Sequence, residues 1–498
     1  MTNHLFDGLS RGQTSDNALF LEHQGQSLSY AEAWARSAQL ARALVSLGVE
    51  PDDRVAVQAE KSVEMVLLYL ACLRAGAIFL PLNTAYTSAE MAYFIDDAEA
   101  AVLVNDSGAL PDGAGGAGKK PPVALTMAQL SVLADGMAAD FATVARGPDD
   151  LAAILYTSGT TGRSKGAMLS HDNLLSNARA LKAHWRFTDA DRLVHALPIF
   201  HAHGLFVAIN VTMVAGGSLI FHKKFDADAV LADLPRATSF MGVPTFYTRL
   251  LQHEGLTKAA CAQIRLFVSG SAPLLAETHR AFEERTGHRI LERYGMTETT
   301  MIASNPYEGE RRAGTVGQAL PGITLRVADP ESHAPLAQGE TGMVELRGPN
   351  VFKGYWRMPE KTASEFTKDG FFITGDLGKF DADGYLHIVG RDKDLVISGG
   401  YNVYPIEVET LIDAIDGVLE SAVIGVPHPD FGEAVTAVVV AKPGAALEGA
   451  AILAGLATQL ARFKQPKEVI FMDELPRNTM GKVQKSELRR RFQDLYRA

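Results

Sequence analysis

Apolar and polar positions alternate along the first part of the chain in blocks that predict strands and helices in turn. Residues 54–58 have the pattern of a short strand, and Lys61–Leu73 place apolar side chains on one face at helical spacing. Gly76 ends this helix, and a buried strand resumes over residues 77–82. The succession is a β-α-β unit, which is typical of a layered α/β domain with parallel strands.

The pattern changes twice further along the chain. A second α/β region covers about 151–298, and short strands separated by Gly, Pro and Asp indicate a β-rich region over about 314–390. Beyond it, helix and strand patterns alternate in a smaller unit with a basic C-terminal helix. We therefore predict an α/β protein with two domains. Residues 1–390 form a large N-terminal domain of layered α/β subdomains plus a β-rich subdomain, and residues 391–498 form a small mobile α+β domain.

One largely apolar stretch, residues 204–221, has almost the length of a membrane span. It contains Asn210 and Thr212 and is interrupted by Gly216-Gly217, whereas a span needs about 20 clean apolar residues. We predict a buried helix followed by a strand.

Composition narrows the class of protein and its partners. The 498 residues exceed one ordinary domain, and 47% hydrophobic with 21% charged residues is ordinary for a folded chain. The charge of −11 repels phosphate backbones and anionic lipids, so we expect neither nucleic acid nor membrane as a partner. Two cysteines and an N-terminus without a signal-peptide pattern favour a reducing cytoplasm.

The strongest local signal for chemistry is Tyr156-Thr-Ser-Gly-Thr-Thr-Gly-Arg-Ser-Lys-Gly166, placed between a predicted strand and a predicted helix. Its glycines free backbone N–H groups to approach an anion, its hydroxyls can donate to phosphate oxygens, and Lys165 adds positive charge. It is not a Walker A loop, because Ser164 and not glycine precedes the lysine. The run predicts a phosphate-binding loop.

This run resembles the phosphate loop of the superfamily of acyl- and aryl-CoA synthetases, adenylation domains and firefly luciferase. Seven further motifs of that superfamily follow in order: Leu197-Pro-Ile-Phe-His-Ala-His203, Ser269-Gly-Ser-Ala-Pro-Leu274, Tyr294-Gly-Met-Thr-Glu298, Gly339-Glu-Thr-Gly-Met-Val-Glu345, Thr374-Gly-Asp-Leu377, Gly390-Arg-Asp-Lys-Asp-Leu-Val-Ile-Ser-Gly-Gly400 and Pro476-Arg-Asn-Thr-Met-Gly-Lys482. The resemblance implies an AMP-forming ligase that uses ATP, Mg²⁺ and coenzyme A. A substrate carboxylate attacks the α-phosphate of ATP, and a thiol then displaces AMP from the acyl-AMP.

The resemblance also implies residue roles in nucleotide binding. Thr297 would touch the α-phosphate, Glu298 would coordinate Mg²⁺ together with Thr160, Asp376 would accept both ribose hydroxyls, and Arg391 would reach the ribose. The remaining nucleotide contacts would come from the phosphate loop and from two adenine-facing segments: Thr157, Ser158, Gly159, Thr160, Thr161, Gly162 and Lys165; Gly270, Ser271 and Ala272; and Tyr294, Gly295 and Met296.

In the C-terminal part, the resemblance makes Lys482 the adenylation lysine, which bridges the substrate carboxylate and the α-phosphate. Lys393 stands at the hinge position, and Gly399 and Gly400 would wall the pantetheine tunnel. A further expectation is that a lysine acetyltransferase and deacetylase act on Lys482, since acetylation removes its charge.

The acyl pocket is where the substrate should be decided. His201 matches the histidine that gates this pocket and counts among the catalytic residues, and Ser271 would line it; a metal pair of His201 and His203 is disfavoured because no third ligand is evident. Arg293 stands directly before the Tyr294 motif, where a neutral residue would leave room for a ring or chain. A guanidinium there needs an anion, and Arg249 on a bordering helix could assist.

The natural anion is a second carboxylate on the substrate. This combination of Arg293 and Arg249 resembles malonyl-CoA synthetases, which implies malonate as the substrate and methylmalonate as a second one. Alternatively, Arg293 turns away and pairs with Glu292 or another acid. The motifs are also compatible with a medium-chain or aryl acyl-CoA synthetase such as a 4-coumarate ligase, and with a free-standing adenylation enzyme that loads a carrier protein. Nothing positively supports a luciferase-like oxygenase, and the intact motifs disfavour a non-catalytic binding protein.

Overall fold

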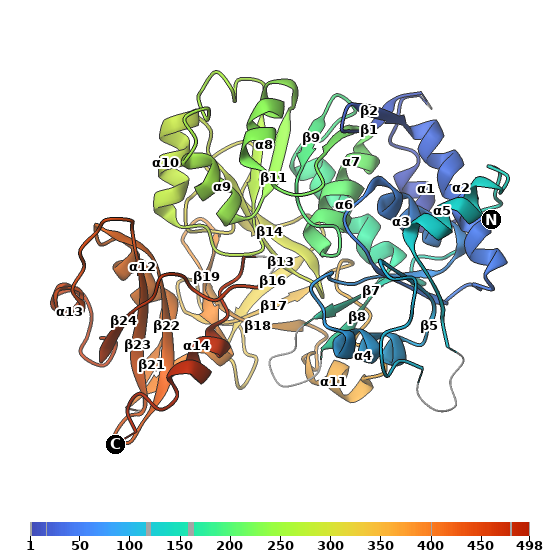
Figure 1. The fold of residues 1–498 in the computed structure, drawn as a ribbon. Helices are drawn as coiled ribbons and strands as arrows, with labels where there is room; N and C mark the ends of the chain where they lie inside the picture. Colours follow the sequence, from blue (N-terminus) through green and yellow to red (C-terminus); the bar gives the residue numbers. More distant parts are fainter. Residues whose placement is uncertain are drawn as a thin grey trace.

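The structure, a computed structural model, describes residues 2–15, 17–115, 121–157, 164–399, 401–478 and 481–497. Within these residues the chain forms four sheets, three in the large N-terminal part and one in the C-terminal part (Figure 1). The α/β class and the large-plus-small organisation predicted from the sequence are confirmed. The predicted boundary at residue 391 falls at the end of a strand and stays a prediction.

The first large sheet contains the predicted β-α-β unit. Its strands run in the order β6 (Val123–Leu125), β5 (Ala100–Asn105), β3 (Arg54–Gln58), β4 (Ile78–Pro81), β7 (Leu151–Thr157) and β8 (Lys165–Ser170). Strands β3 and β4 pair in parallel, and α3 (Val63–Ala75) connects them. All residues of α3 from Met65 onward are buried, so this helix is a central element of the core and not a surface helix.

The second large sheet supplies most of the candidate site. Its order is β15 (Gln318–Ala319), β14 (Thr300–Ser304), β13 (Leu291–Met296), β12 (Leu266–Ser269), β11 (Ser239–Gly242), β9 (Arg192–His195), β10 (Ser218–Phe221), β1 (Leu19–His23) and β2 (Gln26–Ser29). The strands from β13 through β1 pair in parallel, and the two edges are antiparallel.

Helices pack on these sheets, and one large hydrophobic cluster contains α3 together with part of each sheet, while two smaller clusters hold other buried residues of the sheets. The remaining helices are α1 (His4–Leu9), α2 (Tyr30–Ser46), α4 (Ser88–Ala98), α5 (Met127–Asp135), α6 (His171–His184), η1 (a π-helix, His203–Ile209), α7 (Asn210–Ala215), α8 (Ala227–Asp233), η2 (a 3-10 helix, Leu234–Arg236), α9 (Pro244–Leu251), α10 (Ala276–Thr286) and α11 (Pro359–Ser364).

The apolar stretch at 204–221 is the buried helix and strand that its polar interruptions predicted. The helices η1 and α7 are buried throughout, Gly216 ends α7 in a left-handed conformation, and β10 follows. Among the described residues, no helix combines the length and the apolar character that crossing a bilayer requires.

The setting of the phosphate loop differs from the prediction. Strand β7 leads into the loop and the predicted helix is α6, as expected, but β8 lies between the loop and this helix and pairs antiparallel with β7. Helix α6 begins only at His171, after β8. The predicted loop therefore joins two strands. The sequence reasoning missed β8 because Lys165–Ser170 is short and starts inside the loop motif.

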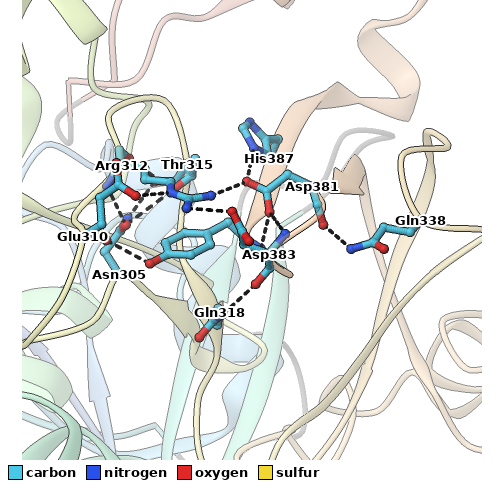
Figure 2. A network of polar contacts seen from close by, with 10 residues as sticks. Asn305, Glu310, Arg312, Thr315, Gln318, Gln338, Asp381, Asp383 and His387 are labelled. Carbon is cyan, nitrogen blue, oxygen red and sulfur yellow. Dashed lines mark hydrogen bonds and ion pairs between the residues drawn. The ribbon is translucent and has the colours of Figure 1, made fainter.

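The β-rich region forms a four-stranded antiparallel sheet of β16 (Thr324–Ala328), β17 (Gly342–Arg347), β18 (Phe372–Phe380) and β19 (Leu386–Arg391). Arg312 ties the segment after β14 to this sheet, because its guanidinium donates to Asp381 at 3.0 Å and to Asp383 at 2.8 Å (Figure 2). Its backbone N–H donates to Asn305, whose amide donates in turn to the Glu292 carbonyl in β13. The network fixes the position of β13 from outside the site.

The C-terminal unit is built as the sequence predicted, with two additional short strands. It contains η3 (a 3-10 helix, Asp392–Asp394), β20 (Val396–Ser398), β21 (Tyr401–Val403), α12 (Pro405–Asp413), β22 (Val418–His428), β23 (Gly432–Ala441), α13 (Gly449–Ala457), β24 (Glu468–Phe471) and α14 (Lys485–Phe492). Its five strands form one sheet around a separate apolar core. The unit lies beside the β-rich sheet, with the C-terminus at its outer end (Figure 1).

Candidate active site

Arg293 lies in β13 of the second large sheet, just beyond the point where the parallel pairing of β13 with β12 ends. Register pairs Ser269 of β12 with Glu292 of β13, so the next positions, Gly270 and Arg293, are neighbours. A Cβ added to Gly270 would lie 2.3 Å from the Cζ of Arg293. The guanidinium therefore lies directly on the Gly270 backbone, and glycine is required there to make room for it.

Among the residues that the structure describes, no acidic side chain pairs with the buried guanidinium of Arg293. The residue is 4% exposed, and its Nε and one terminal nitrogen have no hydrogen-bond partner. Glu292 does not pair with it, because successive side chains of a strand point to opposite faces, and Glu292 accepts a hydrogen bond from the Gly314 N–H at 3.3 Å. Burial lowers the pKa of Arg293 to about 9, so the group is charged at neutral pH.

Two histidines of the Leu197–His203 motif border this cation. Burial and the charge of Arg293 lower the pKa of His201 to about 4, and that of His203 well below its usual value. His203 is buried, and its Nδ1 lies 3.2 Å from the Ser271 hydroxyl. Both rings are therefore neutral at physiological pH. His203, whose role the sequence left open, links the histidine segment to the Ser269–Leu274 motif.

The predicted ribose site is a connected polar group. The Tyr294 hydroxyl donates to Asp376 at 2.5 Å, and the Arg391 guanidinium lies 2.8 Å from the other carboxylate oxygen. Asp376 is buried, and its backbone N–H donates to Thr374 at 3.0 Å. Burial, followed by the charge of Asp376, raises the pKa of Tyr294 well above its usual value. The carboxylate that should receive the ribose is thus held in a fixed orientation.

Glu298 lies at the turn that follows β13, which Gly295 closes tightly because a Cβ there would lie 1.9 Å from the Thr300 carbonyl oxygen. Glu298 is buried, and the Tyr355 hydroxyl donates to it at 2.9 Å. The Lys165 ammonium lies 4.2 Å from the centre of the Tyr355 ring. Burial raises the pKa of Glu298, so a cation bound there would stabilise its charged form.

The donor set at Glu298 suits magnesium and not a protein-only metal centre. Among the described residues, no group of three or more His, Cys, Asp or Glu side chains could hold a metal ion. Magnesium binds through one or two carboxylates, with substrate phosphates and water completing its shell. Glu298 can supply that single carboxylate. The sequence analysis missed Tyr355 because it lies in no motif and reaches Glu298 only in the fold.

The C-terminal unit brings Lys482 to the same place. A Cβ added to Gly481 would lie 3.3 Å from the Thr245 hydroxyl at the start of α9, so the two parts of the chain are in contact beside Lys482. The Lys482 side chain is open to solvent, yet the protein around it, followed by the charge of Arg391, lowers its pKa to about 8. The charge of Lys482 also contributes to the lowered pKa of His201.

Arg249 lies on the exposed face of α9, and its supporting role stays a prediction. Helix α9 buries Tyr247 and Leu250, whereas Arg249 is exposed, because residues two apart on a helix point about 200° away from each other. Tyr247 is the α9 residue beside Arg293: each group's charge influences the pKa of the other, and the Tyr247 hydroxyl donates to the Val268 carbonyl at 2.7 Å. Helical spacing in Pro244–Leu251 was the signal that could have distinguished the two.

The other predicted residues are placed as follows. Thr157 ends β7, Met296 ends β13, Thr297 is half-buried in the next turn, Ala272 is half-buried beyond β12, Lys393 is exposed in η3, and Gly399 is exposed between β20 and β21. Ser158, Gly159, Thr160, Thr161, Gly162 and Gly400 lie outside the described residues, so their predicted roles stay predictions.

Comparisons with known proteins agree on the family. Residues 10–356 match the AMP-binding enzyme family, and residues 407–482 match the AMP-binding enzyme C-terminal domain. The feruloyl-CoA synthase of an Amycolatopsis species is 38% identical, with 97% of each chain covered. The malonate–CoA ligase of Arabidopsis thaliana is 32% identical, with 99% of this chain and 91% of the relative covered.

Among solved structures, ATP-bound MatB from Rhodopseudomonas palustris is 58% identical over 100% of both chains, with a TM-score of 0.96. The apo form of MatB, at the same identity and coverage, has a TM-score of 0.85. Together with the motifs and the site geometry, these matches show that the chain belongs to the AMP-binding enzyme family, as an ATP-dependent, AMP-forming acyl-CoA ligase.

Proposed function

We propose that this ligase activates a short dicarboxylate, malonate and secondarily methylmalonate, and transfers the acyl group from acyl-AMP to coenzyme A. The observation that carries the proposal is the buried, unpaired guanidinium of Arg293 at the predicted acyl pocket. The malonate–CoA ligase among the relatives also supports it, while the feruloyl-CoA synthase shows that family membership alone leaves the acid open.

Energetics favours an anionic substrate tail. Removing a charged group from water costs several kcal/mol, and a protein accepts this cost where an opposite charge with good hydrogen-bond geometry offsets it. Arg293 has no such partner among the described residues, and both neighbouring histidines are neutral. A distal carboxylate would accept hydrogen bonds from the free N–H groups of Arg293, whereas an aromatic or aliphatic tail would leave these N–H groups without an acceptor.

The chain's own groups fit the first half-reaction. The Lys482 ammonium, beside His201, would hold the reacting carboxylate and the α-phosphate together as negative charge develops. Asp376 would fix the ribose, since Tyr294 and Arg391 already orient its carboxylate. Glu298 would hold Mg²⁺, which supplies charge neutralisation at the phosphates.

For the second half-reaction we propose that the C-terminal unit rotates about Lys393. The placement of Lys482 against the N-terminal part, and the higher TM-score to the ATP-bound than to the apo form of MatB, support assigning this arrangement to adenylation. Gly399 is exposed here and would reach the site only after rotation, to border the bound pantetheine. Coenzyme A is proposed as the acceptor thiol.

The test is pyrophosphate release with malonate, methylmalonate, propionate, butyrate and ferulate as the acids, with coenzyme A as the only acceptor thiol. We expect the highest kcat/KM with malonate and formation of malonyl-CoA. Propionate is the matched control, because it has the same carbon number and lacks only the distal charge. A preference for propionate or ferulate would contradict the proposal, and adenylate formation without a CoA product would indicate an enzyme that loads a carrier protein.

A further inference from the structure

A buried lysine without an acidic partner lies at the base of the histidine segment. Lys61, between β3 and α3, is 8% exposed and forms no ion pair within the described part of the chain. Its ammonium lies 2.8 Å from His195 Nδ1, 2.9 Å from the His195 carbonyl oxygen and 4.2 Å from the centre of the Phe221 ring. Lys61 thus connects the first large sheet to the end of β9 in the second.

The hydrogen bonds of His195 have one consistent direction. Its Nε2 lies 2.8 Å from the Gly204 carbonyl oxygen, which can only accept, so Nε2 carries the proton. Burial, followed by the charge of Lys61, lowers the pKa of His195 well below its usual value, and the ring is neutral. Nδ1 therefore accepts from Lys61. The chain of donors runs from Lys61 through His195 to Gly204.

Gly204 is the point where this chain meets the loop that carries both histidines. A Cβ on Gly204 would lie 2.0 Å from the Pro198 carbonyl oxygen, so residues 196–203 form a tight loop that His195 closes across its base. That loop carries His201, whose pKa the charges of Arg293 and Lys482 lower, and His203, whose Nδ1 lies 3.2 Å from the hydroxyl of Ser271, the residue after the Gly270 that Arg293 packs on. A displacement of Gly204 would move both histidines relative to Arg293.

We propose that Lys61 and His195 are positioning residues of the acyl pocket, which hold the His201–His203 segment in register with Arg293. Burying Lys61 without an acidic partner opposes folding and lowers its pKa well below the usual value, so its presence is better explained by the geometry that its hydrogen bonds impose on this segment than by folding. The inference rests on the proposed function only in taking His201 to border the acyl pocket.

The first test is Lys61→Met, which keeps the length of the side chain and removes its N–H donors. With the acid that the wild type prefers, we expect KM for the acid to rise about ten- to a hundredfold, KM for ATP to stay unchanged, and the melting temperature to hold or rise. Lys182→Met is the matched control: Lys182 is half-buried and donates to the Val214 carbonyl at 3.1 Å, a hydrogen bond that shares no residue with the Lys61–His195–Gly204 chain. It should leave both KM values unchanged.

The second test uses His195, so the inference remains testable if Lys61→Met fails to fold. Glutamine can accept from Lys61 through its oxygen and donate to Gly204 through its nitrogen, so His195→Gln should retain the wild-type KM for the acid, and His195→Leu should not. Combining Lys61→Met with His195→Leu should add little to either change alone. Three results would overturn the inference. One is an equal increase in KM for the acid in His195→Gln and His195→Leu, and another is an additive increase in the double variant. The third is a parallel increase in KM for the acid and for ATP together with a lower melting temperature. Because the acid is the one that the wild type prefers, a failed malonate preference leaves this test intact.

Discussion

Replacing Arg293 by methionine separates a substrate-binding arginine from a structural one. The change removes the charge and keeps the bulk of the side chain against Gly270. With malonate bound, the variant would leave the distal carboxylate buried and unpaired, and breaking a buried pair costs about 3–5 kcal/mol. At tenfold for each ~1.4 kcal/mol, kcat/KM for malonate should fall roughly a hundred- to several-thousand-fold.

The same structure predicts the opposite result for stability and for neutral acids. Arg293 forms no ion pair that the variant would break within the described residues, and burial of its charge opposes folding, so the melting temperature should hold or rise. Propionate has no distal charge, so its kcat/KM should hold or rise as well.

The assay is pyrophosphate release with malonate and propionate as paired substrates, together with thermal unfolding of each protein. Arg249→Met is the matched control, since Arg249 is an exposed arginine on neighbouring α9: it should leave propionate kinetics unchanged and lower kcat/KM for malonate, if at all, far less than Arg293→Met. An equal loss with malonate and propionate, accompanied by a lower melting temperature, would refute the reasoning and make Arg293 a structural residue.

Three further predictions concern the two half-reactions. Lys482→Ala should abolish adenylate formation but still convert supplied malonyl-AMP and coenzyme A to the thioester; equal loss of both reactions would contradict its assignment. The pKa of Lys482 is lowered to about 8, so its charge is lost as pH rises through that value and wild-type adenylation should decline above about pH 8. A flat adenylation rate from about pH 7 to about pH 9.5 would contradict a role for the charged lysine in this step. Lys393→Pro should let adenylate accumulate while thioester formation falls, because proline fixes φ at the hinge; a matched fall in both steps would indicate misfolding.

The sequence was sufficient where the determinants are local. The β-α-β unit around α3 follows from hydrophobic spacing, and the α12–α14 unit from alternating patterns, because buried faces impose these periods on the chain. The motifs placed Tyr294, Asp376 and Arg391 among the nucleotide-binding candidates, and the fold brings these three together. Local pattern failed at β8, where six residues are too few to distinguish a strand from the start of a helix.

The sequence alone could not show which groups near Arg293 compensate its charge. Whether it pairs with Glu292 depends on strand register and on the Gly314 N–H that occupies that carboxylate, and both are set by segments distant in sequence. The position of Arg249 depends on which face of α9 packs inward.

The contact of Lys61 with His195 is a further case, because it joins two sheets that have no common local pattern. Residue identity along the chain therefore determined the family chemistry and the candidate set. Burial and partner geometry, which arise only when separate segments pack together, decided which charges are left for a substrate to satisfy.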